Sequence, residues 1–395
     1  MSETLYLFNP DHDLALAHGV HHYVPPRSAL EFRNDAATLP IWTGGSVVLV
    51  SGEMDSPDFL QMCRLFGLSP AFVTESQLGT LPVGEVRPWG WNHNLRAQLL
   101  GWGMEPAVLP GTETLNGIRR LSHRRTAMDA MEFVRERISS PQQLPLSAVE
   151  LTDMGQVERF VEDHGEVVLK MPWSGSGRGL RRVFHHLTPH QAGWAAHSIR
   201  SSGCVMGEPF YRVVQDFAME FQCRQQVEFC GYSLFKTQNG VYQENILLPD
   251  GGIVNELSHW LDPKLIEETK VLMTDFLTQK ALPWYQGPLG VDMFVYQMGN
   301  QYFLNPAVEI NFRMTMGMLS SLFVRNFMAE ECHGQLKVTF APVPGDLLKE
   351  HTELARRFPP RIQDGRLVSG YLSLTPVTPQ TRYAVRVISA PCSGK

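Results

Sequence analysis

The sequence predicts a mixed fold, an α/β region followed by α+β regions, and three observations carry this prediction. The chain has 395 residues, which corresponds to two or three domains because a domain usually holds about 100 to 200 residues. Strand-like and helix-like stretches alternate through residues 1–120, a pattern typical of parallel strands joined by helices. From the glycine-rich stretch near residue 175 onward, many β-rich runs follow one another, which favours hairpins.

The first region contains three short β-rich runs, LYLFN, VVLVS and PAFVT. Helical spacing of apolar residues follows at about 28 to 39, 57 to 67 and 92 to 101. From Ser122 the segment SHRRTAMDAMEFVRERI has helical character and leads into the second region. Two further segments are expected to be helices, TPHQAGWAAHSIRSS and DPKLIEETKVLMTDFLTQKA.

Charge and cysteine usage exclude several classes of function. The formal net charge of -6 gives no long-range attraction to nucleic acids or anionic membranes, so neither is expected as a partner. The six cysteines are scattered without a CxxC pair, which predicts reduced thiols rather than a zinc or redox site. The acidic N-terminus lacks the pattern of a signal peptide, and no apolar run reaches the roughly 18 to 20 residues of a membrane span. A cytoplasmic protein is expected.

A glycine-rich loop follows Lys170 in the segment VVLKMPWSGSGRGL, at residues 167–180. The loop SGSGRG has three glycines, which leave backbone amides free to close over phosphate oxygens. A P-loop is excluded because the lysine precedes the loop, and a dinucleotide-binding fingerprint is excluded because strand-like residues follow it. The pattern predicts a β-hairpin flap, although a solvent-exposed turn remains an alternative from the loop alone.

An acidic row lies about 120 residues further along, in GVDMFVY and AVEINFR. The period-2 alternation of a strand puts Glu309, Asn311 and Arg313 on one face and apolar residues on the other. Asp292 stands among apolar neighbours in the same way. Two carboxylates and an amide oxygen form part of a shell suited to Mg²⁺. The alternative is a structural ion pair between Glu309 and Arg313.

With these motifs, residues 120–330 resemble the ATP-grasp superfamily. The resemblance matches Lys170 to the lysine before the flap and Glu208 in VMGEPF to the acidic residue of the hinge strand, where Glu208, Pro209 and Phe210 would meet adenine. It assigns to the flap Ser174, Gly175, Ser176, Gly177 and Gly179. It also makes Asp292, Glu309 and Asn311 the magnesium ligands and Arg313 the contact to the γ-phosphate or acyl phosphate.

The resemblance implies two α+β subdomains that grip ATP, preceded by a Rossmann-like domain. The corresponding ranges are 1–120, 121–205 for the small subdomain with the flap, and 206–395 for the large subdomain with the metal ligands.

The chain departs from the superfamily pattern at two places. A second lysine is usual near the start of the grasp region, whereas this chain offers Arg124, or alternatively Arg125; arginine keeps the charge that contacts phosphate. An unusual NPA stretch at residues 305–307 precedes Glu309. Proline removes a donor from the strand ladder, so a bulge or bend is expected there.

The roles of several other polar residues are left open by the sequence. Lys236 is either a further phosphate or substrate contact in the cleft or a solvated lysine on a hairpin. The N-terminal stretch NPDHD and its surroundings suggest either a transition-metal site or a turn that ends a strand, and they contain Asp11, His12, Asp13, His18, His21 and His22. Arg27 and Arg33 are weak candidates for an anionic substrate.

The function implied by the resemblance is that of an ADP-forming ligase. It uses ATP with Mg²⁺, or alternatively Mn²⁺, and joins a small-molecule carboxylate to an amine or a thiol through an acyl phosphate. Lys170 and Arg313 are the expected catalytic residues. The alternatives are a kinase acting on a small-molecule hydroxyl group and a nucleotide-binding module without chemistry. A homodimer is the expected assembly because it is the commonest one.

Overall fold

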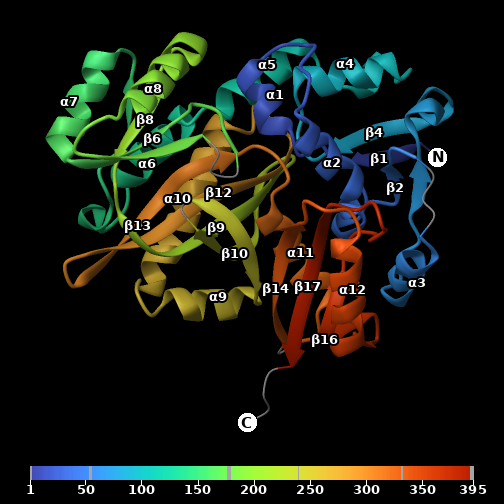
Figure 1. Cartoon of the computed structure of the whole chain (residues 1–395). Helices are drawn as coiled ribbons and strands as arrows, with labels where there is room; N and C mark the ends of the chain where they lie inside the picture. Colours follow the sequence, from blue (N-terminus) through green and yellow to red (C-terminus); the bar gives the residue numbers. More distant parts are fainter. Residues whose placement is uncertain (1, 53–55, 176–178, 239, 331, 392–395) are drawn as a thin grey trace.

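The computed structural model describes residues 2–52, 56–175, 179–238, 240–330 and 332–391 (Figure 1). These residues form three sheets, of four, four and nine strands. In Figure 1 the N-terminal helices (blue) and the helices of the small sheet (green) lie on opposite sides of the view, and the long strands of the third sheet run between and below them. Short 3-10 helices occupy Leu39–Thr43, Glu75–Thr80, Pro106–Val108 and Pro141–Gln143.

The N-terminal sheet is parallel, as the alternation of strands and helices predicts. Its strands are β1 (Glu3–Leu7), β2 (Val47–Leu49), β3 (Ala71–Val73) and β4 (Val83–Pro88), in the order β3-β2-β1-β4. The helices of this region are α1 (His12–His18), α2 (Arg27–Asp35), α3 (Pro57–Leu65) and α4 (His93–Gly101). Because β2 and β4 lie on opposite sides of β1, the strand order reverses there, and the segments that follow β1 and β4 meet at one edge of the sheet.

The small sheet is antiparallel and carries the glycine-rich loop. Its order is β5-β8-β6-β7, with β5 (Val149–Leu151), β6 (Glu166–Lys170), β7 (Leu180–Phe184) and β8 (Val205–Pro209). Apolar residues of α7 (Met154–His164) and α8 (Pro189–Ser202) pack on it. A capping box between Thr188 and Gln191 starts α8, and Gly203 in the left-handed region ends it. The hairpin β6–β7 brackets the loop, as predicted.

The nine-stranded sheet is antiparallel and has the order β13-β12-β9-β10-β11-β14-β17-β16-β15. Its strands are β9 (Arg212–Cys223), β10 (Val227–Gln238), β11 (Val241–Leu247), β12 (Gly287–Met298), β13 (Gln301–Asn311), β14 (Cys332–Phe340), β15 (Arg361–Gln363), β16 (Arg366–Ser373) and β17 (Tyr383–Pro391). The remaining helices are α5 (Thr112–Leu121), α6 (Arg125–Arg135), α9 (Asp250–Leu257), α10 (Pro263–Lys280), α11 (Met316–Phe327) and α12 (Asp346–Arg357).

A bulge precedes the acidic row, as the NPA stretch predicts. Asp292 pairs with Glu309, but Phe294 pairs with Asn305, so β13 contains extra residues between these two pairs. The Asn305 side chain accepts a hydrogen bond from the Ala307 amide at 3.2 Å, which satisfies one backbone donor that the bulge removes from the ladder.

One apolar core joins the N-terminal region to the C-terminal half of the large sheet. Trp42 is fully buried among Phe66 and the α11 residues Phe323 and Phe327. Its indole nitrogen donates a hydrogen bond to the Leu374 carbonyl at 2.8 Å. The two regions therefore fold against each other, and the domain boundaries at 120 and 205 remain predictions.

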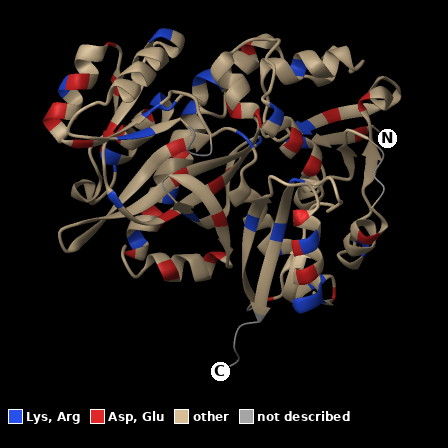
Figure 2. Cartoon of the chain, viewed as in Figure 1, with Lys and Arg blue, Asp and Glu red and all other residues tan. Residues whose placement is uncertain are grey.

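Basic and acidic residues are interspersed along the helices and strands (Figure 2). Across the described residues, every helix is too short or too polar to span a lipid bilayer.

Replacement of Trp42 by alanine tests the shared core. We expect Trp42→Ala to lower the free energy of unfolding by about 3 to 5 kcal/mol, because it leaves a large cavity and an unsatisfied Leu374 carbonyl. Urea titration followed by both circular dichroism and fluorescence measures this loss. Two separate transitions in the wild type, with only one of them shifted in the variant, would contradict a common core.

Candidate active site

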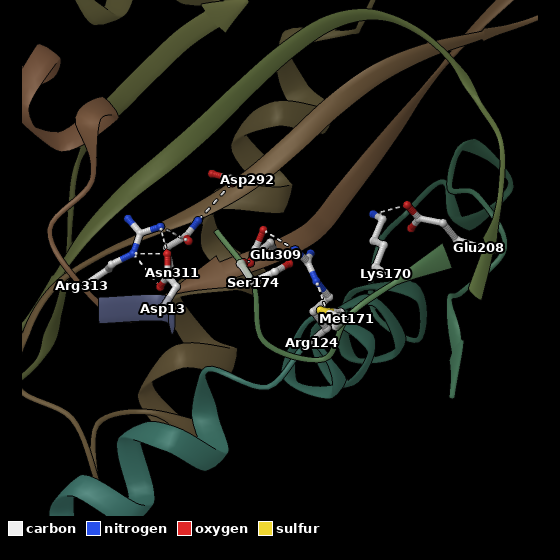
Figure 3. Close-up of polar contacts among 10 residues, drawn as sticks. All are labelled: Asp13, Arg124, Lys170, Met171, Ser174, Glu208, Asp292, Glu309, Asn311 and Arg313. Carbon is white, nitrogen blue, oxygen red and sulfur yellow. Dashed lines mark hydrogen bonds and ion pairs between the residues drawn. The ribbon is translucent and has the colours of Figure 1, made fainter. Parts of the chain in front are cut away.

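A cavity of about 700 Å³ lies between the small sheet and the large sheet. Its lining includes Lys170 from β6 and the acidic row of β12 and β13. Figure 3 shows polar contacts in and beside the cavity, with Arg124 and Glu309 between the Lys170–Glu208 pair and a network around Arg313. The structure therefore brings the two distant motifs to opposite walls of one cavity.

Lys170 ends β6 and is held by Glu208 of the neighbouring strand β8. Because Val168 pairs with Glu208 and Lys170 with Met206, the lysine and the glutamate are diagonal neighbours on one face. Their ion pair is buried, as the cost of burying an unpaired ammonium group requires.

Pro209 and Phe210 follow Glu208 along the wall of the cavity. The Arg182 guanidinium stacks on the Phe210 ring at 3.6 Å from its centroid. This end of the cavity combines a flat apolar surface with strand backbone, which suits a planar base.

Arg124, immediately before α6, connects the flap to the acidic row. Its Nε donates to the Met171 carbonyl at 3.0 Å, and its Nη2 donates to the Ser174 hydroxyl at 3.1 Å. The same Nη2 forms a 2.9 Å ion pair with Glu309. Arg125, the alternative, is exposed and pairs with Glu150. Of the two arginines, the structure brings Arg124 to the cavity.

The described glycines of the flap lie where a side chain would collide with a neighbour. A Cβ atom at Gly179 would overlap the Ser174 side chain, and one at Gly175 would overlap the carboxylate of Asp13. A larger residue at either position would therefore force the neighbouring side chain to move. Ser176 and Gly177, also predicted as flap residues, lie outside the described residues.

Asp292 and Glu309 face each other across the β12–β13 pair. The Asn311 amide donates to Asp292 at 3.1 Å, and its oxygen accepts from Arg313 at 2.9 Å. Burial, followed by repulsion from Glu309 and Glu220, raises the pKa of Asp292 to about 8. A bound cation would relieve this repulsion.

The residues present fit a magnesium ion, because they offer hard oxygen atoms on one surface. Among the described residues, no group of three or more His, Cys, Asp or Glu side chains is placed to hold a metal ion by itself. The oxygen of Asn311 and the phosphate oxygens of a nucleotide would complete the shell around Asp292 and Glu309.

Lys236 is not brought to the cavity. Its neighbours Phe235 and Thr237 line the cavity, whereas Lys236 pairs with Glu244 at 2.9 Å and its side chain is 57% exposed. Arg27 is also exposed and pairs with Glu31.

Two further polar residues belong to this region: Asp13, which the sequence offered only as part of a transition-metal site or a turn, and Glu220, which was not predicted as a site residue. Asp13 of α1 forms an ion pair with Arg313 from the N-terminal region. Glu220 of β9 is buried in the cavity wall and accepts hydrogen bonds from Thr315 at 2.8 Å and Ser233 at 3.0 Å. A carboxylate among the apolar residues of AMEFQ was the only sequence signal for Glu220.

Comparison with solved structures identifies the fold. Biotin carboxylase from Campylobacter jejuni, in a complex with β-γ-ATP, has a TM-score of 0.53 and 14% identity over 99% of this chain and 88% of its own. An ADP complex of PurK, N5-carboxyaminoimidazole ribonucleotide synthetase, has a TM-score of 0.51 and 14% identity over 98% and 93%. The N5-carboxyaminoimidazole synthetase from Staphylococcus aureus, with ADP, has a TM-score of 0.50 and 12% identity over 98% and 93%. The chain has an ATP-grasp fold.

Neither a known sequence family nor a curated protein sequence matches the chain. At these low identities the solved structures establish the ATP-grasp fold and nothing finer. The roles of individual residues therefore rest on the geometry of the cavity.

The protonation of Glu220 gives a prediction about stability and pH. Burial raises its pKa from 4.5 to about 7 in the folded state. The folded protein thus holds this proton more tightly than the unfolded chain, and stability is lost as the pH rises from about 4.5 to about 7, by on the order of 3 kcal/mol.

We expect Glu220→Gln to remove this part of the pH dependence. Urea unfolding of both proteins at pH 5, 6, 7 and 8 measures this. The free energy of unfolding of the variant should increase relative to that of the wild type as the pH rises. Parallel stability curves for the two proteins would contradict the raised pKa.

Proposed function

We propose that this protein is an ATP-dependent ligase that activates a substrate carboxylate as an acyl phosphate, with release of ADP, for attack by an amine or a thiol. The observation that carries the proposal is the single cavity lined by Lys170, Arg124 and the acidic row. The solved structures with the same fold support it, because those proteins are synthetases and carboxylases crystallised with ATP or ADP.

In this proposal the nucleotide lies along the cavity from the hinge to the acidic row. The base contacts Glu208, Pro209 and Phe210, and the phosphates contact Lys170, Arg124 and the flap residues Ser174, Gly175 and Gly179. Lys170 and Arg124 are each paired with a carboxylate in this structure. A triphosphate offers both cations an acceptor of higher charge, so these pairs exchange partners when it binds.

Asp292, Glu309 and Asn311 would hold magnesium. When bound, the ion neutralises the phosphate oxygens and polarises the transferring phosphoryl group. Glu309 would then share its charge with the ion, which leaves more of the Arg124 guanidinium for phosphate. Arg313 is next to Asn311 on the same row and is the cation available to the transferring group.

The chemistry needs no nucleophile from the protein. A carboxylate oxygen of the substrate forms a bond to the γ-phosphorus as the bond to the ADP oxygen breaks. The amine or thiol then attacks the carbonyl carbon, inorganic phosphate leaves, and the nucleophile gives up its proton. Exclusion of water by the closed flap protects the acyl phosphate from hydrolysis.

Calorimetric titration with Mg²⁺-ATP tests the nucleotide site. Lys170→Met and Glu309→Gln should each weaken binding by about tenfold or more, since each removes a charged contact to phosphate or metal. Lys236→Ala is the matched control, because it removes a lysine outside the cavity, and we expect wild-type affinity. Equal binding by all four proteins would refute the nucleotide site.

Trapping with hydroxylamine tests the acyl phosphate. A panel of carboxylic acids is first tested with Mg²⁺-ATP for ADP release. For an acid that stimulates release, hydroxylamine should then yield one hydroxamate per ADP, because it attacks the activated carbonyl. ADP release from a hydroxyl compound with formation of a phosphate ester, and without hydroxamate, would instead identify a kinase.

A further inference from the structure

The NPDHD stretch, whose role the sequence leaves open, reaches the active site through Asp13. The stretch follows β1, and Asp13 lies in the first turn of α1. Its carboxylate contacts Arg313, which is 300 residues away in sequence, through three atom pairs: Nε to Oδ1 at 2.9 Å, Nε to Oδ2 at 3.1 Å and Nη2 to Oδ2 at 2.8 Å. This is the two-pronged geometry of a strong arginine–carboxylate pair.

The hydrogen bonds of Arg313 show which of its donors are free. A guanidinium group has five N–H donors. Asp13 takes one on Nε and one on Nη2, the Asn311 oxygen takes the second on Nη2 at 2.9 Å, and the Met314 carbonyl takes one on Nη1 at 3.2 Å. One donor on Nη1 remains.

A metal ion would release a second donor. The Asn311 oxygen would be a ligand in the proposed magnesium site, and coordination there would weaken its hydrogen bond with Nη2. Arg313 would then have one donor available on each terminal nitrogen, the number that a phosphoryl group engages with two of its oxygens. Throughout this exchange, Asp13 keeps the Nε side of the guanidinium occupied.

Asp13 also competes with the metal ligands for Arg313. The guanidinium is attracted by Glu309 and Asp292 as well as by Asp13. Without Asp13, Arg313 would be drawn toward these two carboxylates and would oppose the binding of a cation there. The missing side chain of Gly175 leaves the room that Asp13 occupies below the flap.

We propose that Asp13 is a positioning residue, which holds Arg313 with its terminal nitrogens free for the transferring phosphoryl group and away from the metal ligands. The N-terminal domain thereby completes the ATP site. This inference rests on the proposed function, in particular on a contact between Arg313 and the γ-phosphate.

The competing explanation is an ordinary ion pair between two domains, and the chain offers a matched control for it. Glu31 of α2 pairs with Arg382, just before β17, at 2.9 Å, and the two side chains are 21% and 25% exposed. The Asp13 and Arg313 side chains are 23% and 15% exposed. Both pairs join the N-terminal domain to the large subdomain, but Glu31 and Arg382 do not line the cavity.

The experiment compares the affinities for Mg²⁺-ATP and Mg²⁺-ADP by calorimetry. It uses the full chain as wild type, Asp13→Asn, Arg313→Gln, the double variant and Glu31→Gln. The wild type should prefer ATP. We expect Asp13→Asn and Arg313→Gln each to reduce this preference by about tenfold, because both remove the oriented contact to the γ-phosphate. The double variant should lose no more than Arg313→Gln alone, and Glu31→Gln should keep the full preference.

Each other outcome overturns one part of the scheme. A preference that survives in Arg313→Gln refutes the γ-phosphate contact, and the role of Asp13 with it. If Arg313→Gln loses the preference but Asp13→Asn keeps it, only the positioning role is refuted. An equal loss of the preference for ATP in Asp13→Asn and Glu31→Gln would show that the Asp13–Arg313 pair is only a structural ion pair. Thermal denaturation of all five proteins with bound ADP verifies that each one is folded.

Discussion

Electrostatic repulsion among carboxylates on one face of the large sheet is the constraint on which the site depends. Glu220, Asp292 and Glu309 come from the adjacent strands β9, β12 and β13 and line the same cavity. Burial raises the pKa of both Glu220 and Asp292, and for Asp292 the repulsion from Glu309 and Glu220 adds to this rise. A sheet with such a face is stable only when cations from elsewhere in the chain, or bound ions, lie against it.

The fold supplies these cations from separate segments. Arg124 lies between α5 and α6. Arg313 follows β13 and is paired with Asp13 from the N-terminal region. Lys170 comes from the small sheet and carries its own counter-ion, Glu208. The groups that balance charge in the cavity therefore come from three parts of the chain. The apolar core around Trp42 holds the N-terminal region against the large subdomain, so that Asp13 reaches across.

The sequence predicted those parts of the fold and site that local patterns encode. Glu309, Asn311 and Arg313 follow from the period of a strand, the bulge before them from Pro306, and the flap from its glycines. The placement of Asp13 beside Arg313 and of Glu220 beside Thr315 depends on which strands become neighbours, and no local pattern carries that information. The sequence left the role of Lys236 open for the same reason. The alternation of residues along β10 separates its two faces but does not indicate which face meets the cavity.

The Glu220 carboxylate in the cavity wall occupies space that two glycines leave open. Gly290 pairs with Glu220 across the sheet, and a Cβ atom at Gly290 would lie 2.7 Å from Glu220 Oε2. A Cβ atom at Gly317 would overlap the other carboxylate oxygen. The carboxylate thus fills the space left by two absent side chains, next to the first turn of α11 and to the Thr315 hydroxyl that caps it. The helix N-terminus, the two hydroxyl donors and the charge of Arg313 favour the ionised form of Glu220, whereas its burial raises the pKa. The cavity wall therefore carries an acid with a pKa near neutrality at Glu220 and a permanent cation at Arg313.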